Sequence, residues 1–198
     1  MMKKFLFSMM VCGACSVIAG ELATESWNVA NDWKVEDQSL VSGKPGFLYL
    51  KDRKNYTKAE FSAEVTPIKA TGASWKVAGI GFLQAGDQFW YLGLVESPDN
   101  NNKSHFFELK MMQGKTWGAE SKLKNLKRKS VGSWNYGETY KFTIKLADNK
   151  IAGTIANKDG KVIAEFEYEL SADSVNGGTP VLRNALMETK YGKFSLAE

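Results

Sequence analysis

The sequence predicts an all-β protein organised as a two-sheet antiparallel β-sandwich. Short apolar segments with alternating side chains follow one another closely, and turn-forming clusters such as Ser42–Gly46 and Ser97–Lys103 separate them. No segment of useful length repeats its apolar residues with the 3.6-residue period of a helix. The segment Val77–Glu96 also indicates two buried strands joined by the turn at Ala85-Gly86-Asp87.

The predicted hairpin Val77–Glu96 is apolar on both faces. Ile80 and Phe82 share one face of the first strand, because strand side chains alternate. The second strand places Trp90, Leu92 and Leu94 on one face and Phe89, Tyr91, Gly93 and Val95 on the other. A strand with one face in water would carry polar residues at every second position. We therefore expect one face to lie in the core. The other face contains glycines, which either leave room for a groove or mark a simple β-bulge.

Residues 1–20 are predicted to be a secretory signal peptide. Lys3 and Lys4 precede the apolar run Phe5–Ala19, which is shorter than the roughly 20 residues of a membrane span. Secretion or a periplasmic location follows, and the alternative is a lipoprotein anchored through Cys15. Both cysteines lie in this segment, so the predicted single domain 21–198 contains no disulfide, and its net charge falls from +4 to +2. This charge gives no reason to expect a nucleic-acid partner.

The rest of the chain supplies further strands. We expect a half-exposed strand at Tyr56–Thr66, a loop at Pro67–Ser74 and a strand at Ser104–Met112. Further on, we expect a basic loop or edge strand at 121–130, a three-strand meander over 140–146, 151–156 and 162–170, and two closing strands at 181–186 and 189–196.

A carbohydrate-binding groove is the leading functional hypothesis. Phe106, Glu108 and Lys110 share one strand face, and on the neighbouring strand they would lie beside Phe89 and Tyr91. Aromatic faces stack on the C–H groups of sugar rings, and carboxylate and amine groups hydrogen-bond to hydroxyls. Ordinary cross-strand pairing is the alternative.

Three further side chains are candidates for the same groove. Trp75 and Trp117 adjoin loops and are the tryptophans that we expect to be exposed as ligand platforms. Arg183, near the closing strands, is a candidate polar anchor. Glu108 is the candidate general acid or base if the protein is an enzyme.

Other titratable groups are expected to have structural roles. Glu165, Glu167 and Glu169 alternate on one strand and are interpreted as a solvated face rather than a catalytic pair. His105 is the only histidine and is expected to be buried or at a sheet edge, so a zinc site is not predicted. Asp99–Asn102 offers oxygen ligands for Ca²⁺ without the spacing of a known calcium loop, and a polar turn is the preferred interpretation. The basic cluster Lys122–Lys129 is interpreted as solvated, with an acidic polysaccharide as its alternative partner.

Four local patterns resemble the concanavalin A-like (laminin-G-like jelly-roll) superfamily. They are WKVEDQSL at 33–40, YTKAEFSAEV followed by GIGF at 79–82, the run from Trp134 to Leu146, and the ending GGTPVLR…YGKFSL. Within this superfamily the chain is most similar to secreted bacterial domains grouped with the 3-keto-disaccharide hydrolases. The resemblance implies a jelly-roll sandwich and a carbohydrate partner, and it allows glycoside hydrolysis.

The chain departs from the catalytic patterns of these relatives. It lacks the Glu-x-Asp-x-x-Glu run of family 16 glycoside hydrolases, and it has Val77-Ala78-Gly79-Ile80-Gly81-Phe82 where the 3-keto-disaccharide hydrolases have Asn-Ser-Gly-Ile before an arginine. Three hypotheses therefore remain: a glycan-binding domain, a glycoside hydrolase of the 3-keto-disaccharide type, and a structural or adhesive envelope protein.

Overall fold

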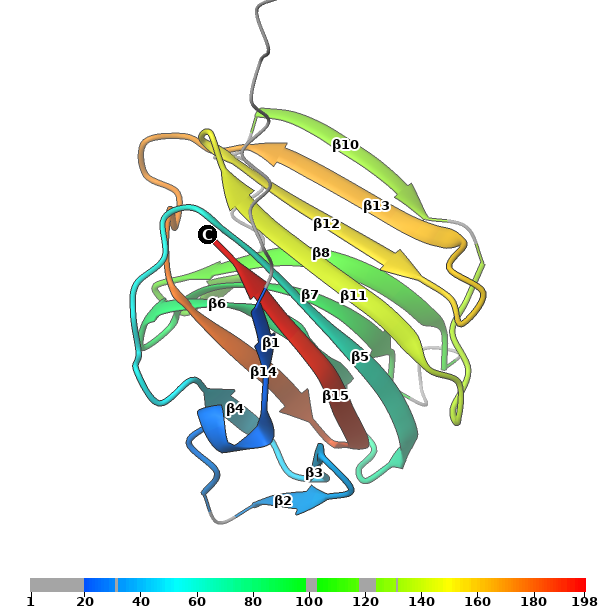
Figure 1. The fold of residues 1–198 in the computed structure, drawn as a ribbon. Helices are drawn as coiled ribbons and strands as arrows, with labels where there is room; N and C mark the ends of the chain where they lie inside the picture. Colours follow the sequence, from blue (N-terminus) through cyan, green and yellow to red (C-terminus); the bar gives the residue numbers. More distant parts are fainter. Residues whose placement is uncertain (1–19, 31, 99–102, 118–123, 131) are drawn as a thin grey trace, which may run out of the picture.

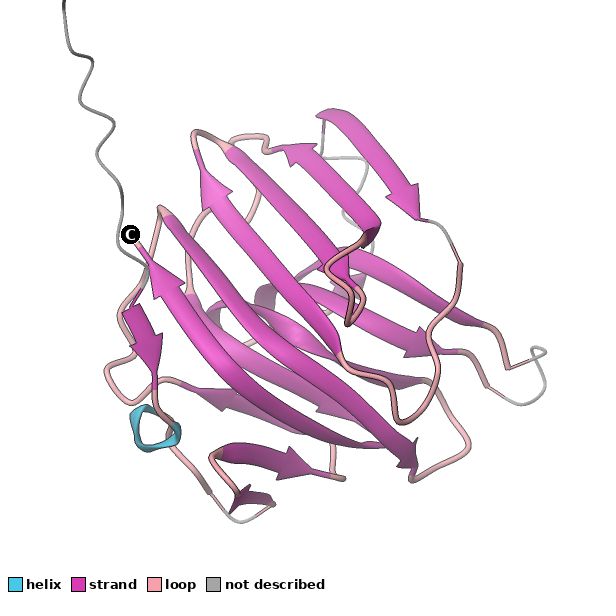
Figure 2. Ribbon diagram, turned by 45° about the vertical axis from the view of Figure 1, so that its right-hand side comes forward, coloured by secondary structure: helices cyan, strands magenta, loops and turns pink. Residues whose placement is uncertain are grey.

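The computed structural model describes residues 20–30, 32–98, 103–117, 124–130 and 132–198, and these form two antiparallel sheets packed face to face (Figures 1 and 2). This confirms the predicted all-β sandwich. The described residues contain one short helical turn, η1 at Thr24–Ser26. None of their helices is long and apolar enough to cross a membrane.

The larger, nine-stranded sheet runs in the order β10-β13-β12-β11-β5-β15-β3-β2, and β1 also pairs with β15. Its strands are β1 (Gly20–Leu22), β2 (Trp33–Glu36), β3 (Ser39–Ser42), β5 (Ala59–Ala70), β10 (Lys124–Ser130), β11 (Tyr140–Ala147), β12 (Lys150–Ala156), β13 (Val162–Glu169) and β15 (Met187–Ala197). Figure 1 shows this sheet in front, with β10 at its outer edge.

The smaller, six-stranded sheet runs in the order β4-β14-β6-β7-β8-β9. Its strands are β4 (Gly46–Tyr49), β6 (Lys76–Ala85), β7 (Gln88–Glu96), β8 (His105–Gln113), β9 (Thr116–Trp117) and β14 (Thr179–Ala185). The predicted central hairpin is therefore β6–β7, in the middle of this sheet.

The main hydrophobic core lies between the two sheets. From the six-stranded sheet, Ile80, Phe82, Trp90, Leu92 and Leu94 all point into it, and each is fully buried. Alternation predicted that these residues share one face of each strand, and the structure confirms this. The alternate residues, including Phe89 and Tyr91, form a separate cluster on the opposite face.

The expected loop over Pro67–Ser74 was wrong for its first four residues, because β5 continues through Pro67 to Ala70, and a loop follows from Thr71 to the start of β6 at Lys76. Proline cannot donate a ladder hydrogen bond and is therefore confined to edges and irregular pairings. Here the pairing of β15 with β5 shifts register between Glu188 and Thr189, where Thr189 lies opposite Pro67. The irregularity accommodates the proline and lets the strand continue.

The two closing strands do not close one sheet. β14 pairs with β6 and β4, whereas β15 pairs with β5 and β3 in the other layer. Leu186 makes the sharp change of direction between them with a left-handed backbone (φ 51°). The end of the chain therefore contributes one strand to each sheet.

The meander β11-β12-β13 is confirmed, and β13 continues the sheet to the edge strand β10. The glutamates of β13 lie opposite the basic residues of β10: Glu165 opposite Lys129 and Glu167 opposite Lys127. Lys127 Nζ lies 3.0 Å from Glu167 Oε1. The interpretation of these glutamates as a solvated, charge-paired face is therefore confirmed, and the basic segment forms an edge strand.

Candidate functional site

The outer face of the six-stranded sheet, turned away from the core, carries a second apolar cluster. Its buried members are Val77, Phe89, Tyr91 and Val95, and its half-buried members are Phe47, Leu83, Phe106, Met112 and Ala185. Apolar residues occupy this face because β6, β7 and β8 lack the polar alternation of a solvated strand. A clustered apolar face on the outside of a sheet is typical of a binding surface.

Arg183 lies at the centre of an aromatic cluster at one end of this face. Its guanidinium carbon is 4.2 Å from the ring centre of Tyr91, 4.8 Å from Trp117, 5.2 Å from Phe89 and 5.8 Å from Phe47. We call these four rings with Arg183 the arginine cluster. The rings also contact one another: Phe89 packs edge-on to Phe47 at 4.8 Å and to Trp117 at 5.8 Å.

The arginine cluster brings together four strands. Strand pairing places Arg183 of β14 opposite Phe47 of β4 on one side and Gly79 of β6 on the other. Because Gly79 and its partner Gly93 carry no side chains, the guanidinium reaches across to Tyr91 of β7. Burial lowers the pKa of Arg183 from its usual value, and the neighbouring Tyr91 and Glu108 oppose this effect.

Glu108 forms the polar part of the site. It is 8% exposed, its Oε1 accepts a short hydrogen bond from the Tyr91 hydroxyl, and its Oε2 lies 3.3 Å from Lys110 Nζ. Both carboxylate oxygens thus have a polar partner. On the described strands of the six-stranded sheet, Glu108 is the one carboxylate whose side chain points to the outer face, because Glu96 points into the sandwich.

A second aromatic pair lies at the other end of the face. Trp75 packs edge-on against Phe106 with ring centres 6.3 Å apart, and Phe106 is opposite Val95 in the β7–β8 pairing. Val95 and Tyr91 are four residues apart on β7, which corresponds to about 13 Å. The outer face therefore has aromatic groups at both ends and charged groups between them.

The exposure predicted for two of the tryptophans is observed. Trp75 is 47% exposed and Trp117 is 44% exposed, and both adjoin the apolar face. The remaining tryptophans, Trp27, Trp33, Trp90 and Trp134, are buried. All predicted ligand-binding residues thus lie on one face.

The glycines on this face have two different functions. A side chain on Gly93 would contact the Tyr91 ring at 3.0 Å, so Gly93 makes room for that ring. A side chain on Gly79 or Gly81 would instead overlap the backbone oxygen of Leu92 or Trp90, on the neighbouring strand. Gly93 thus leaves room for a side chain, as a groove would require. Gly79 and Gly81 leave no open space and instead allow the two strands to approach closely.

Sequence reasoning missed Phe47. This residue was assigned only to a short strand, yet its ring joins the arginine cluster. The available signal was the alternation of Gly46–Tyr49, which puts Phe47 and Tyr49 on the face opposite buried Leu48. Placing that face beside Phe89 requires the β4–β14–β6 pairing, which no local pattern indicates.

A polar network occupies the inner side of the same sheet. Glu96 Oε1 lies 2.7 Å from Lys76 Nζ, and Glu96 Oε2 is within 2.9 Å of His105 Nε2 and 2.7 Å of the Tyr136 hydroxyl. Lys76 and Glu96 are both buried, and the half-buried His105 ring stacks on Trp134 at 3.9 Å. Burial pulls the pKa of Glu96 upward, but the hydrogen bonds from Lys76, Tyr136 and His105 outweigh it and lower the pKa.

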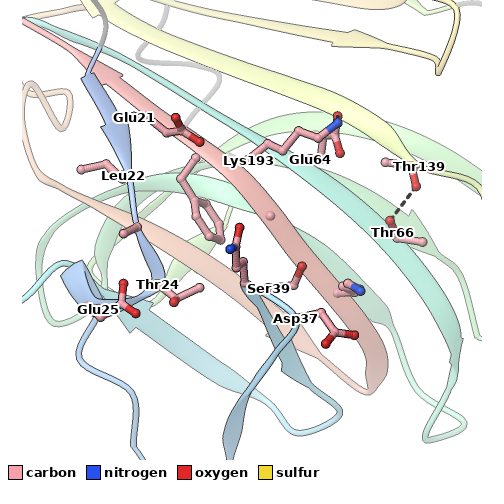
Figure 3. Close-up of a pocket in the computed structure, with 15 residues that line it drawn as sticks. Glu21, Leu22, Thr24, Glu25, Asp37, Ser39, Glu64, Thr66, Thr139 and Lys193 are labelled. Carbon is pink, nitrogen blue, oxygen red and sulfur yellow. Dashed lines mark hydrogen bonds and ion pairs between the residues drawn. The ribbon is translucent and has the colours of Figure 1, made fainter.

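The nine-stranded sheet has a hollow of about 750 Å³ on its outer side, next to β1 and η1 (Figure 3). Its lining includes Glu21, Asp37, Ser39 and the ion pair between Glu64 and Lys193, whose charged atoms are 2.9 Å apart. Its one aromatic lining residue, Phe194, is buried in the core. The hollow therefore lacks an exposed ring for stacking on a sugar.

In the described part of the chain, no group of three or more His, Cys, Asp and Glu side chains converges. The candidate calcium segment Asp99–Asn102 lies outside the described residues, as do the signal segment with Cys15 and the lysine Lys122.

No protein-family model matches this sequence, and no curated protein matches it. Solved structures do. A carbohydrate-binding module, CBM66 from Bacillus subtilis, is similar with a TM-score of 0.63 at 7% identity over 87% of this chain and 96% of that one. A putative glycosyl hydrolase from Parabacteroides distasonis gives a TM-score of 0.57 at 12% identity over 87% and 93% of the two chains.

A third similar structure is xylan β-1,4-xylosidase from Bacillus halodurans, with a TM-score of 0.62 and 11% identity. The match covers 90% of this chain but only 38% of the xylosidase, so it concerns one part of that enzyme. At these identities the likeness is one of fold. Together with the two-sheet topology, it shows that this chain has the antiparallel β-sandwich fold that its sequence predicts.

Proposed function

We propose that this protein binds carbohydrate on the outer face of the six-stranded sheet. The observation that carries the proposal is the combination, on that face, of exposed and half-buried aromatic rings with Glu108, Lys110 and Arg183. Rings stack on the apolar faces of sugars, while charged groups that converge beside them fix the hydroxyls. The shared fold with a carbohydrate-binding module supports the same function.

The signal-like segment 1–20 adds a location to the proposal. We place the mature chain, from Glu21 onward, outside the cytoplasm, where polysaccharides are found. Release after signal cleavage is the favoured arrangement, and anchoring through a lipidated Cys15 is the alternative. Mass spectrometry of the mature protein distinguishes the two by its N-terminal residue and by an added lipid mass.

Depletion from solution by a panel of insoluble and soluble polysaccharides tests the binding function. Trp75→Ala and Trp117→Ala should each reduce retention on the glycan that the wild type binds, with unchanged thermal unfolding, because both rings are exposed. Val162→Ala is the matched control, since Val162 is equally exposed (44%) but lies on the other sheet. Full retention by both tryptophan variants would refute this site.

Glycoside hydrolysis is the alternative function, with Glu108 as the acid or base. It has weaker support, since hydrolysis ordinarily uses two carboxyl groups about 5–10 Å apart. The described strands of the six-stranded sheet place only Glu108 on the outer face. Sugars released by the wild type from polysaccharides or 3-keto-disaccharides, and not released by Glu108→Gln, would establish the enzyme. A structural or adhesive envelope role would follow if neither binding nor release were detected.

A further inference from the structure

The guanidinium of the half-buried Arg183 has an unusual environment for a charged group. Four aromatic rings surround it within 5.8 Å, and its Nη1 atom is buried without a hydrogen-bond partner. Buried charges are normally paired or fully hydrogen-bonded, because removal from water is costly. Aromatic faces attract a cation but accept none of its hydrogen bonds in full.

Neighbouring carboxylates do not neutralise this cation. Among the described residues no ion pair to Arg183 is formed. The nearby Glu108 is instead held by the Tyr91 hydroxyl and by Lys110 Nζ. With Arg183 and Lys110 positive and Glu108 negative, this part of the face carries a net charge of one positive unit.

We propose that the arginine cluster recognises an acidic sugar, whose carboxylate or sulfate group pairs with the Arg183 guanidinium. This inference rests on the proposed function and names its substrate class. Because Arg183 as a whole is only half-buried, an anion at the edge of the cluster can accept hydrogen bonds from the part of the guanidinium that reaches the surface. A guanidinium binds planar carboxylates through two parallel hydrogen bonds. Trp117, half exposed at the edge of the cluster, provides the ring against which the same sugar stacks.

The remaining charged groups fit an acidic ligand. Lys110, whose side chain is about a third exposed, offers a second cation on β8, opposite Tyr91. Glu108 is negative, but Lys110 offsets its charge locally and the Tyr91 hydroxyl donates to its other oxygen. The carboxylate therefore helps to hold Tyr91 and Lys110 in place under the ligand.

Matched pairs of polysaccharides provide the test. Isothermal titration calorimetry compares polygalacturonate with its fully methyl-esterified form, and dextran sulfate with dextran, so that each pair differs only in charge. We expect the wild type to bind at least one acidic member, with affinity that falls as salt rises. The first pair identifies a carboxylate ligand and the second a sulfate.

The variant Arg183→Met removes the charge and keeps an apolar side chain. We expect Arg183→Met to weaken binding of the acidic glycan about 30-fold or more, because removing one partner of a desolvated charge pair typically has an effect of this size. Its thermal midpoint should stay the same or rise, because an unpaired buried charge has been removed. If it does not fold, Arg183→Lys repeats the test, since it keeps the charge but loses the planar fork.

Arg128→Met is the matched control. Arg128 also lies over an aromatic ring, 5.8 Å from the centre of Phe166, but on the edge strand β10 of the other sheet. Unchanged binding of the acidic glycan by Arg128→Met supports the proposal. Weaker binding by Arg128→Met together with unchanged binding by Arg183→Met would instead assign the acidic ligand to β10 and overturn the proposal. Binding of neutral glycans alone would overturn this inference and keep the proposed function, and no glycan binding would overturn both.

Discussion

The guanidinium carbon of Arg183 lies 4.2 Å above the ring centre of Tyr91, and the hydroxyl of that same ring donates to Glu108. One tyrosine therefore connects a half-buried cation to a buried anion. The ring supports Arg183 through its face, and the hydroxyl orients Glu108 through its edge. A change at Tyr91 should for that reason affect both charged groups of the site.

Tyr91→Phe should weaken glycan binding by roughly tenfold and lower the free energy of unfolding by about 1.5–3 kcal/mol, the usual worth of a hydrogen bond to a charged group. Calorimetry and urea unfolding measure the two effects. Tyr140→Phe is the control, because the Tyr140 hydroxyl also donates to a carboxylate, Glu138 Oε2 at 2.6 Å, away from the outer face. Equal loss of binding in both variants would contradict the role given to Tyr91.

The buried pair Lys76 and Glu96 should behave as a unit. Glu96→Gln leaves the Lys76 ammonium buried without its counter-charge and should cost about 3–5 kcal/mol of unfolding free energy. The double variant Lys76→Met/Glu96→Leu should recover part of that loss, because it removes the unpaired ammonium, while the Tyr136 hydroxyl and His105 Nε2 lose their acceptor. Chemical denaturation of the wild type, Lys76→Met, Glu96→Leu and the double variant gives the coupling energy, and simple additivity would contradict the prediction.

The same pair predicts an acid-sensitive stability. The folded-state pKa of Glu96 is lowered, so its ionised form stabilises the fold above the unfolded glutamate pKa of about 4.3. That stabilisation should disappear as the pH falls through the lowered folded-state pKa. Thermal unfolding between pH 7 and pH 3 should show a steeper loss for the wild type than for the Lys76→Met/Glu96→Leu variant. Parallel curves would assign the acid sensitivity to other groups.

Gly79→Ala should disrupt the pairing of β6 with β7. The added methyl group would overlap the backbone oxygen of Leu92, and backbone atoms cannot move aside without breaking the ladder. We expect a loss of about 3 kcal/mol or more, at the high end for single substitutions. Gly43→Ala is the matched control, because its nearest atom, Thr71 Cγ2, would be at an ordinary 3.6 Å. Comparable thermal midpoints for the two variants would show that the strands can separate slightly.

The two sheets approach closely where Gly153 of β12 faces Leu92 of β7. A methyl group on Gly153 would lie 2.8 Å from Leu92 Cδ1. Gly153→Ala should therefore cost about 1–3 kcal/mol by overpacking, and Leu92→Ala about 2–5 kcal/mol by leaving a cavity. The double variant should lose less than the sum, as the new methyl group partly fills the cavity. If the losses of unfolding free energy measured in urea simply add, the two residues are not in contact.

Alternation was sufficient to predict the hairpin and its two faces. Trp90 and Tyr91 were assigned to opposite faces from their positions alone, and the structure has the first in the core and the second outside. This worked because a strand has a period of two residues, which any partner arrangement preserves. The extension of β5 through Pro67 was not predictable in this way, since it depends on an irregular pairing with a strand more than a hundred residues later.

The inner network shows a signal that was available but not used. Lys76 and Glu96 occur in the same phase as the core residues Phe82 and Trp90, and a charged residue in core phase requires a partner. His105 was expected to be buried or at an edge, and it completes this network. The position of Arg183 beside Tyr91 was a different case. It depends on β14 pairing with β6 across a separation of about a hundred residues, which a local pattern does not encode.

Strand β15 follows all the other strands in the sequence, yet it lies between β5 and β3 and also pairs with β1. The pairs β2–β3 and β5–β11 can form without it, but β15 joins them into one sheet. Until β15 is in place, β5 and β3 each have one unpaired edge, and unpaired edges of this kind promote aggregation. Assembly of the nine-stranded sheet therefore depends on pairing between strands far apart in the sequence, which is intrinsically slow.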